Sequence, residues 1–320
     1  MSLSVGKIRQ RLFGISPSEA TFSRRGFHLG ETGVRQYLER VGLTFIQGYD
    51  AALVNREQTN LAFELDQIEN EMRGFAYEGA GMGLALLDLL TPRRARRFQQ
   101  FLENHGSHHR YTLHVGAGWA LARVALRRRS YLRQLDPLLR WLAIDGYGFH
   151  AGYFHQRRFI DGGRLPGRLN EHERKVFDTG LGRSLWFVGC ADVRWISRVI
   201  AGFQASRRAE LWSGVGLACA YAGGIERCEI EALFHAAGQH QAEVGQGAAF
   251  AAKTRQLAGN PTFHTSLACE IFCGLSADAA ASLTDAALKQ LPFDGPKPAY
   301  QIWRKRIQDQ LRLKVGVETS

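Results

Sequence analysis

The stretch Arg73-Gly-Phe-Ala-Tyr-Glu-Gly-Ala-Gly-Met-Gly83, with His114-Val-Gly-Ala-Gly-Trp-Ala-Leu-Ala122 after it, decides the fold of this 320-residue chain. Both segments are rich in glycine and alanine, yet both lie in apolar patterns that predict buried helices. A glycine inside a helix costs roughly 1 kcal/mol relative to alanine, so several together need a reason. We favour close packing of helices, which small residues permit. The alternative is space for a ligand beside the backbone.

The rest of the chain also has a helical period, and the alternating pattern of strands is nearly absent. The predicted fold class is therefore all-α. Asn170 and Glu173 have the spacing of a capping box at a helix start. The glycine- and proline-containing loop at 157–168 is the best candidate for a boundary or a lid. Helices are expected at 31–60, 60–90, 93–104, 111–126, 132–142, 182–204, 206–222, 226–252, 263–273, 276–290 and 299–313, and residues 144–154 carry a run of glycines and aromatic residues.

Three pairs of similar segments indicate an internal repeat. Residues 45–49 match 149–153, residues 73–79 match 183–189, and residues 115–120 match 213–218, with 244–249 as a further echo. We interpret them as a duplicated helical bundle whose Gly/Ala-rich helices are buried, with two copies about a pseudo-two-fold axis and a pocket between them. The expected parts of a single compact unit are an adaptor at 1–30, repeats at 31–142 and 143–260, and terminal helices at 261–320.

The chain is basic, with a formal net charge of +11, and its arginines are clustered at 93–97, 127–129, 157–158 and 207–208. Such clusters attract phosphate, acidic proteins or anionic membrane surfaces; the plain alternative is that they solvate helix faces. No zinc-finger spacing or aromatic–basic signature accompanies them, so no nucleic-acid partner is predicted. No apolar run of about 18 residues occurs, which predicts no integral membrane segment and leaves only surface association open.

The five cysteines do not suggest disulfides. Their number is odd and none forms a Cys-x-x-Cys pair, so we expect buried thiols in a reducing compartment. The start of the chain, 1–11, is charged and lacks the apolar segment of a secretion signal. A cytoplasmic location is therefore predicted.

Polar residues on the buried helices are the candidates for chemistry, because a buried carboxylate must find a partner or change its pKa. The predicted acid/base residues are Glu78, His150, Asp192 and Glu243. The predicted substrate-binding residues are Tyr77, His114, Trp119, Tyr153, Arg183 and Trp212. The structural alternative is that Glu78 pairs with Arg183, or Asp192 with Arg73, across the repeat.

Metal and cofactor sites are not predicted. The histidines between 105 and 114 match no established metal-site spacing, and the chain has no Glu-x-x-His pair. The glycines at 79–83 lack the preceding strand that a dinucleotide-binding motif requires.

Five motifs together resemble an uncharacterised bacterial domain family whose members occur in enediyne polyketide clusters and in other bacteria. They are Phe27-His-Leu-Gly-Glu-Thr-Gly33, Phe45-x-x-Gly-Tyr49, Tyr77-Glu-Gly-Ala-Gly-Met-Gly83, Gly146-Tyr-Gly-Phe-His150 and Trp212-Ser-Gly-Val-Gly-Leu-Ala218. The resemblance covers roughly 1–315 and implies a cytoplasmic partner in specialised-metabolite assembly. It carries over no active-site residue.

The predicted function is binding of a long apolar polyene or isoprenoid-like substrate, with a buried acid or base that promotes its cyclisation or isomerisation. The arginine clusters would recruit an acidic carrier protein or a phosphate-bearing end of the substrate. The alternative is a non-catalytic helical scaffold that docks acidic partner proteins. An enclosed apolar cavity favours the first hypothesis, and a filled interior with a large exposed apolar patch favours the second.

Overall fold

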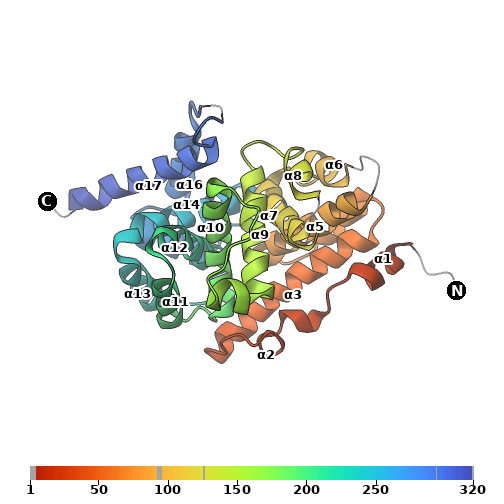
Figure 1. Ribbon diagram of the computed structural model, residues 1–320, viewed down its shortest axis with the longest axis horizontal. Helices are drawn as coiled ribbons and strands as arrows, with labels where there is room; N and C mark the ends of the chain where they lie inside the picture. The colour runs from red at the N-terminus through yellow and green to blue at the C-terminus, as the bar shows by residue number, and fades with distance from the viewer. Residues whose placement is uncertain (1–4, 92–95, 125–126, 293, 319–320) are drawn as a thin grey trace. The chain divides into compact units, whose positions relative to one another are not determined.

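The computed structural model describes residues 5–91, 96–124, 127–292 and 294–318, and within these ranges every regular element is a helix (Figure 1). The all-α prediction is confirmed. The chain divides into two compact units. Unit 1 contains Met1–Phe27 and Arg35–Tyr147, and unit 2 contains His28–Val34 and Gly148–Ser320.

Unit 1 is built around the long helices α3 and α5 and the helix α7, with short helices beside them. Its elements are α1 (Val5–Phe13), η1 (Pro17–Ala20), α2 (Phe22–Arg25), α3 (Thr32–Val54), α4 (Gln58–Asp66), α5 (Asn70–Leu90), α6 (Arg97–Asn104), η2 (Ser107–His109), α7 (Arg110–Arg123), α8 (Arg128–Leu132) and the first half of α9 (Arg140–Phe154). The first residues of α3 belong to unit 2.

Unit 2 continues from the second half of α9, and its helices α10, α12 and α14 pack side by side (Figure 1). Its elements are the π-helical turn η4 (Arg157–Asp161), α10 (Glu171–Val188), α11 (Val193–Gly202), α12 (Ala205–Ala222), α13 (Arg227–Ala237), η5 (Gly238–His240), α14 (Gln241–Ala258), α15 (Phe263–Cys273), α16 (Ala277–Leu288) and α17 (Ala299–Glu318).

The glycines of the core helices mark backbone contacts between neighbours. On α7, a Cβ atom added to Gly116 would lie 1.9 Å from the carbonyl oxygen of Glu78 on α5. A Cβ on Gly118 would lie 2.0 Å from the carbonyl oxygen of Ala143 on α9. Each glycine thus admits a different neighbouring helix, which confirms close packing as the reason for glycine in these helices.

Unit 2 repeats this arrangement. A Cβ on Gly214 of α12 would lie 2.0 Å from the Thr179 carbonyl oxygen on α10, and a Cβ on Gly216 would lie 2.3 Å from the Val244 carbonyl oxygen on α14. Gly-x-Gly triplets begin at positions 79 (with a second, overlapping one at 81), 116, 146, 180, 214 and 245, so these glycine sites follow one another at intervals of 30 to 37 residues, counted from 79. The matching segments 115–120 and 213–218 are therefore three of these intervals apart. A two-fold duplication of the chain stays a prediction.

Several helix boundaries differ from the predicted ones, for local reasons. The helix expected at 182–204 is interrupted because Cys190 and Ala191 adopt left-handed backbone angles, with φ of 52° and 56°. The helix expected at 226–252 is divided at Gly238, where φ is +51°. The arginines at 127–129 do not end α7, which stops at Arg123; they begin α8 instead.

Other boundaries also shift. The helix expected at 31–60 ends at Val54, and the one expected at 60–90 is two helices, α4 and α5. Part of the helix expected at 93–104 lies outside the described residues, and α6 begins at Arg97. The helix expected at 132–142 begins only at Arg140, as α9, and α9 also contains the run of glycines and aromatic residues at 144–154.

The predicted helix start at Asn170 is confirmed. Asn170 and Glu173 form the predicted capping box at the start of α10. None of the five cysteines forms a disulfide, but Cys228 is exposed, so the expectation of five buried thiols is wrong at that position. Among the described residues no single helix has both the length and the apolar composition of a membrane span; only α15 and α16 taken together, bent by 65°, reach that length and composition.

Candidate functional site

Glu78 is held inside unit 1 beside aromatic rings. It is 3% exposed, and its Oε1 accepts a hydrogen bond from the indole N–H of Trp119 at 3.1 Å. The Trp119 ring lies 4.4 Å from the ring of Phe45, measured between centroids. The structure therefore brings two predicted site residues, Glu78 and Trp119, into direct contact.

Tyr77 and His114 are buried in unit 1 with local partners. The Tyr77 hydroxyl donates to Asp66 at 2.9 Å, and its ring stacks on His109 with centroids 3.8 Å apart. His114 Nδ1 lies 2.7 Å from the carbonyl oxygen of Arg110, one helical turn earlier. Burial lowers the pKa of His114 to about 4, although the hydrogen bond to Arg110 opposes this shift. The imidazole is therefore neutral at pH 7.

An aromatic cluster in unit 2 contains three more predicted site residues. The Arg183 guanidinium lies 5.1 Å from the ring centroid of Phe149. Tyr153 lies one turn further along α9, with its ring 6.0 Å from that of Phe149. His150, on the same helix, contacts the ring of Phe154 at 4.7 Å. A pair between Glu78 and Arg183 would join the two units and stays a prediction.

Asp192 has a structural position. It is the N-cap of α11: its Oδ1 accepts the Trp195 backbone N–H at 3.0 Å, and its Oδ2 lies 3.1 Å from His28 Nε2. Burial opposes ionisation of Asp192, but the N–H groups of Trp195 and Arg194 together with His28 outweigh it and lower the pKa of the carboxyl. Asp192 therefore caps α11 as an ionised carboxylate, and its catalytic role stays a prediction.

Glu243 belongs to a polar seam between α14 and α17. One of its oxygens pairs with Arg312, and the other is buried without a hydrogen-bond partner among the described residues. The same seam holds Arg304, 2% exposed, which donates to Gln246 at 3.0 Å and to Ser213 at 3.1 Å. The seam docks α17 on the core helices. The remaining predicted residue, Trp212, is buried in α12.

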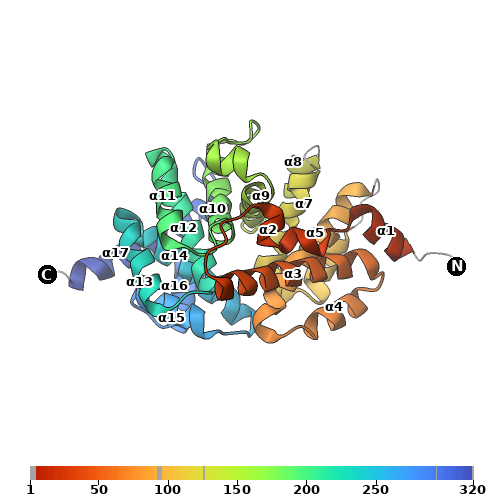
Figure 2. The same ribbon diagram turned by 90° about the horizontal axis from the view of Figure 1, so that it is seen from below.

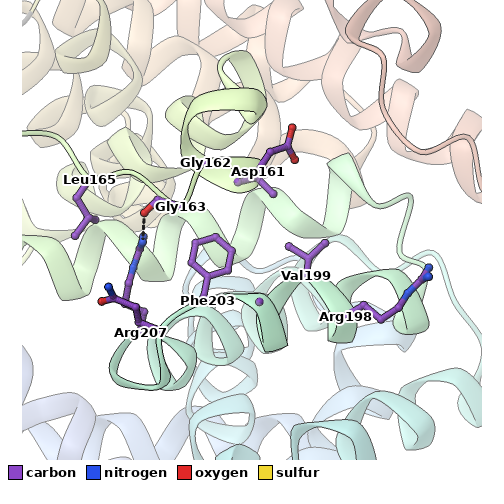
Figure 3. Close-up of a pocket in the computed structure, with 11 residues that line it drawn as sticks. Asp161, Gly162, Gly163, Leu165, Arg198, Val199, Phe203 and Arg207 are labelled. Atoms are coloured by element: carbon purple, nitrogen blue, oxygen red, sulfur yellow. Dashed lines mark hydrogen bonds between the residues drawn. The ribbon is translucent and has the colours of Figure 1, made fainter.

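A solvent-accessible groove of about 510 Å³ lies elsewhere in unit 2 (Figure 3). One wall is the turn η4 with the loop after it, and the other is the C-terminal end of α11 with the start of α12. Its lining residues are Ile160, Asp161, Gly162, Gly163, Leu165, Arg198, Val199, Gly202, Phe203, Gln204 and Arg207. The volume is within the range of small-molecule sites.

The groove has two apolar side chains between two arginines. Figure 3 shows Phe203 and Val199 between Arg207 at one end of the row and Arg198 at the other. Arg198 is exposed, and Gln204 is the N-cap of the 18-residue helix α12, without a side-chain cap hydrogen bond. A helix N-terminus carries partial positive charge and unpaired N–H groups, so the start of α12, at the Arg207 end of the row, also favours an anion. Asp161, exposed on the opposite wall, is the acidic side chain among the lining residues.

Arg207 fixes the loop of the groove to the core. Its Nε and one terminal nitrogen donate to both oxygens of Asp178, at 2.8 and 2.5 Å, and its other terminal nitrogen donates to the Gly163 carbonyl oxygen at 2.5 Å. Both partners of the ion pair are nearly fully buried. The guanidinium is thus occupied by protein groups, and Arg207 shapes the groove while Arg198 faces solvent.

The turn η4 is the second unusual feature of the groove. The Gly162 N–H donates to the Arg157 carbonyl oxygen at 3.1 Å, which is the five-residue spacing of a π-helix. Such turns are rare and occur frequently at functional sites. Arg157, Arg158 and Arg164 are exposed on this same segment. The sequence signals were the 157–168 loop and the arginines at 207–208, but nothing local indicated that α11 would face that loop.

None of the ten predicted site residues lines this groove. Within the described part of the chain, no group of three histidine, cysteine or carboxylate side chains is arranged to hold a metal ion.

Comparison with known proteins gives a family. No curated protein and no solved structure matches the chain. One family matches residues 4–311, which is nearly the whole chain. The protein belongs to the family described as "Protein of unknown function (DUF1702)".

Proposed function

We propose that the protein binds an amphipathic anion, an apolar polyene or isoprenoid-like chain with a phosphate-bearing end, in the groove of unit 2. The observation that carries the proposal is the groove itself: about 510 Å³, with Phe203 and Val199 on its floor and Arg198 and the start of α12 at its edge. The apolar chain gains by leaving water, and the phosphate gains from the exposed Arg198 guanidinium.

The same chemistry suits a role in specialised-metabolite assembly, which the resemblance to proteins of enediyne clusters implies. The proposed substrate is an apolar chain, and the exposed arginines at 157, 158 and 164 would attract an acidic carrier protein that presents it. We expect the protein to act in a reducing cytoplasm, which cysteines without disulfides favour.

Isothermal titration calorimetry with farnesyl diphosphate, farnesol and inorganic diphosphate tests the binding proposal. Farnesyl diphosphate is expected to bind more tightly than either fragment, because both halves of the groove contribute. Arg198→Gln should weaken its binding about tenfold, since a charge-assisted hydrogen bond is lost. The matched control is Arg194→Gln, which removes another exposed arginine one turn earlier on α11, outside the groove lining. Equal effects of the two substitutions, or no binding at all, would count against the groove.

Acid/base-promoted cyclisation or isomerisation is a second candidate function, and the buried carboxylate of Glu78 beside Trp119 and Phe45 favours it. Aromatic rings stabilise a developing cation, and a buried acid can deliver a proton. Glu78→Gln keeps the shape and an acceptor for the indole N–H. Product formation that survives this substitution in the reconstituted pathway would remove Glu78 from the chemistry.

A further inference from the structure

The helix α1 (Val5–Phe13) presents an apolar strip to solvent. Val5, Ile8 and Leu12 are 42%, 43% and 69% exposed. Their spacing of three and four residues places them on one side of the helix. Three large apolar side chains aligned in this way differ from single exposed ones, which are normal on protein surfaces.

The other side of α1 is anchored to unit 1, beside the C-terminal end of α3 (Figure 2). A Cβ on Gly6 would lie 2.3 Å from the Val54 carbonyl oxygen, so the two helices touch through their backbones. One turn later, the Gln10 side chain donates to Asp50 at 2.9 Å. The apolar strip therefore sits on a helix with a fixed orientation, and the face that carries it points away from α3.

Basic residues flank the strip on both sides. With a rotation of about 100° per residue, Lys7 and Arg11 project on one side of the strip and Arg9 on the other. The helix contains no acidic residue. This is the pattern of a helix that lies in the interface of a membrane, with apolar residues inserted and cations at the level of the headgroups.

The neighbouring surface of unit 1 adds positive charge. Burial and then the nearby charges of Arg97 and Arg56 lower the pKa of the Arg9 guanidinium, which shows that the three cations share one region. Arg56 is exposed, whereas Arg97 is partly exposed and pairs with Asp88 at 3.2 Å. The strip thus lies in a cationic surface with which an anionic partner is complementary.

The size of α1 selects between a lipid and a protein. Nine residues form a rod about 14 Å long. A stable protein interface buries about 800 Å² on each partner, which three side chains on such a rod do not supply. Interfacial insertion needs only the exposed apolar side chains and the attraction of each cation to anionic headgroups.

We propose that the cationic face of α1, formed by Val5, Ile8 and Leu12 with Lys7, Arg9 and Arg11, docks the protein on an anionic lipid surface. The proposal is independent of the groove in unit 2, because it rests on different residues and a different ligand.

Flotation of the full chain with vesicles tests it. The protein is expected to bind vesicles of phosphatidylcholine with phosphatidylglycerol and to stay in solution with phosphatidylcholine alone. Raised salt should weaken the binding, because the attraction is screened. The double substitution Lys7→Gln with Arg11→Gln should weaken it more than tenfold, at about fivefold for each cation. Leu12→Ser should weaken it several-fold.

The matched control is Phe63→Ser on α4, which removes an apolar side chain that is also 69% exposed but has Glu64 beside it. Its binding should equal that of the unsubstituted chain, with thermal melting confirming that all variants fold. Equal losses for Leu12→Ser and Phe63→Ser would overturn the proposal, as would equal binding to both kinds of vesicle. A chain that ignores both vesicles but binds polyglutamate would assign the face to an acidic protein instead.

Discussion

At the scale of single residues, the buried polar groups of the core are tied to neighbours by short local bonds. His114 bonds the carbonyl of the preceding turn, Asp192 caps α11, and Arg207 joins Asp178 to the loop of the groove. These contacts explain how isolated polar side chains are accommodated in glycine-rich apolar helices. A buried polar group without a partner destabilises the fold, so these contacts have a structural role.

The burial of His114 predicts a pH dependence of stability. Its pKa is lowered to about 4 in the folded chain and returns to about 6.5 on unfolding. The unfolded state therefore binds more protons between these values, and this contribution is present above pH about 6.5 and lost as pH falls towards about 4. The loss attributable to His114 is on the order of 3 kcal/mol. His114→Leu should show a flatter fall of the free energy of unfolding with pH in urea titrations.

The control for that measurement is the same substitution at His108, whose side chain is exposed, so that the buried imidazole of His114 stays in place. Profiles of equal slope for His114→Leu and the unsubstituted chain would contradict the assignment of a neutral, buried imidazole at position 114.

At the scale of elements, glycine decides how the core helices meet. A methyl group at Gly116 or Gly214 would lie within about 2 Å of a carbonyl oxygen on the next helix, so the backbones would have to separate. We predict that Gly116→Ala and Gly214→Ala each lower the free energy of unfolding by about 3 kcal/mol, because overpacking is not relieved by a rotamer change. Chemical denaturation measures the effect.

Gly33→Ala is the matched control. Gly33 lies in the exposed first turn of α3, and an added Cβ would meet only the Glu31 side chain at 3.7 Å. Alanine there should stabilise the chain by about 0.5 kcal/mol, since alanine is the better helix former. Similar losses at Gly33 and Gly116 would show that flexibility, and not helix contact, explains the glycines.

Local patterns in the sequence predict the presence of these helices better than the residues at which they end. The all-α class, the capping box of Asn170 and the meaning of the glycines depend on neighbouring residues, which a sequence displays. The break in the helix at Cys190 does not depend on neighbouring residues in this way, because no pattern in the surrounding sequence predicts a cysteine with φ of 52°. That conformation is compatible with tertiary contacts around it, where the Gly30 backbone approaches Cys190 closely.

At the scale of the whole molecule, the sites are harder to predict than the fold. The walls of the groove come from segments about forty residues apart, η4 with its loop and the α11–α12 corner. Arg207 was recognised as part of a basic cluster, but its pairing with Asp178 and Gly163 depends on how three elements of unit 2 pack. By contrast, the sequence predicts both Glu78 and Trp119 as site residues, because each interrupts a helix of glycine, alanine and aliphatic residues. The structure brings the two side chains into contact.

Backbone hydrogen exchange of the full chain, with and without farnesyl diphosphate, tests most directly whether the groove of unit 2 is the binding site. Slower exchange is predicted in residues 160–165 and 198–207, which line the groove, because a bound ligand orders that loop and the start of α12. Val199→Asp, which places a charge on the apolar floor, should abolish the change. Slower exchange confined to residues 75–83 and 114–121 would contradict the account and place the ligand beside Glu78.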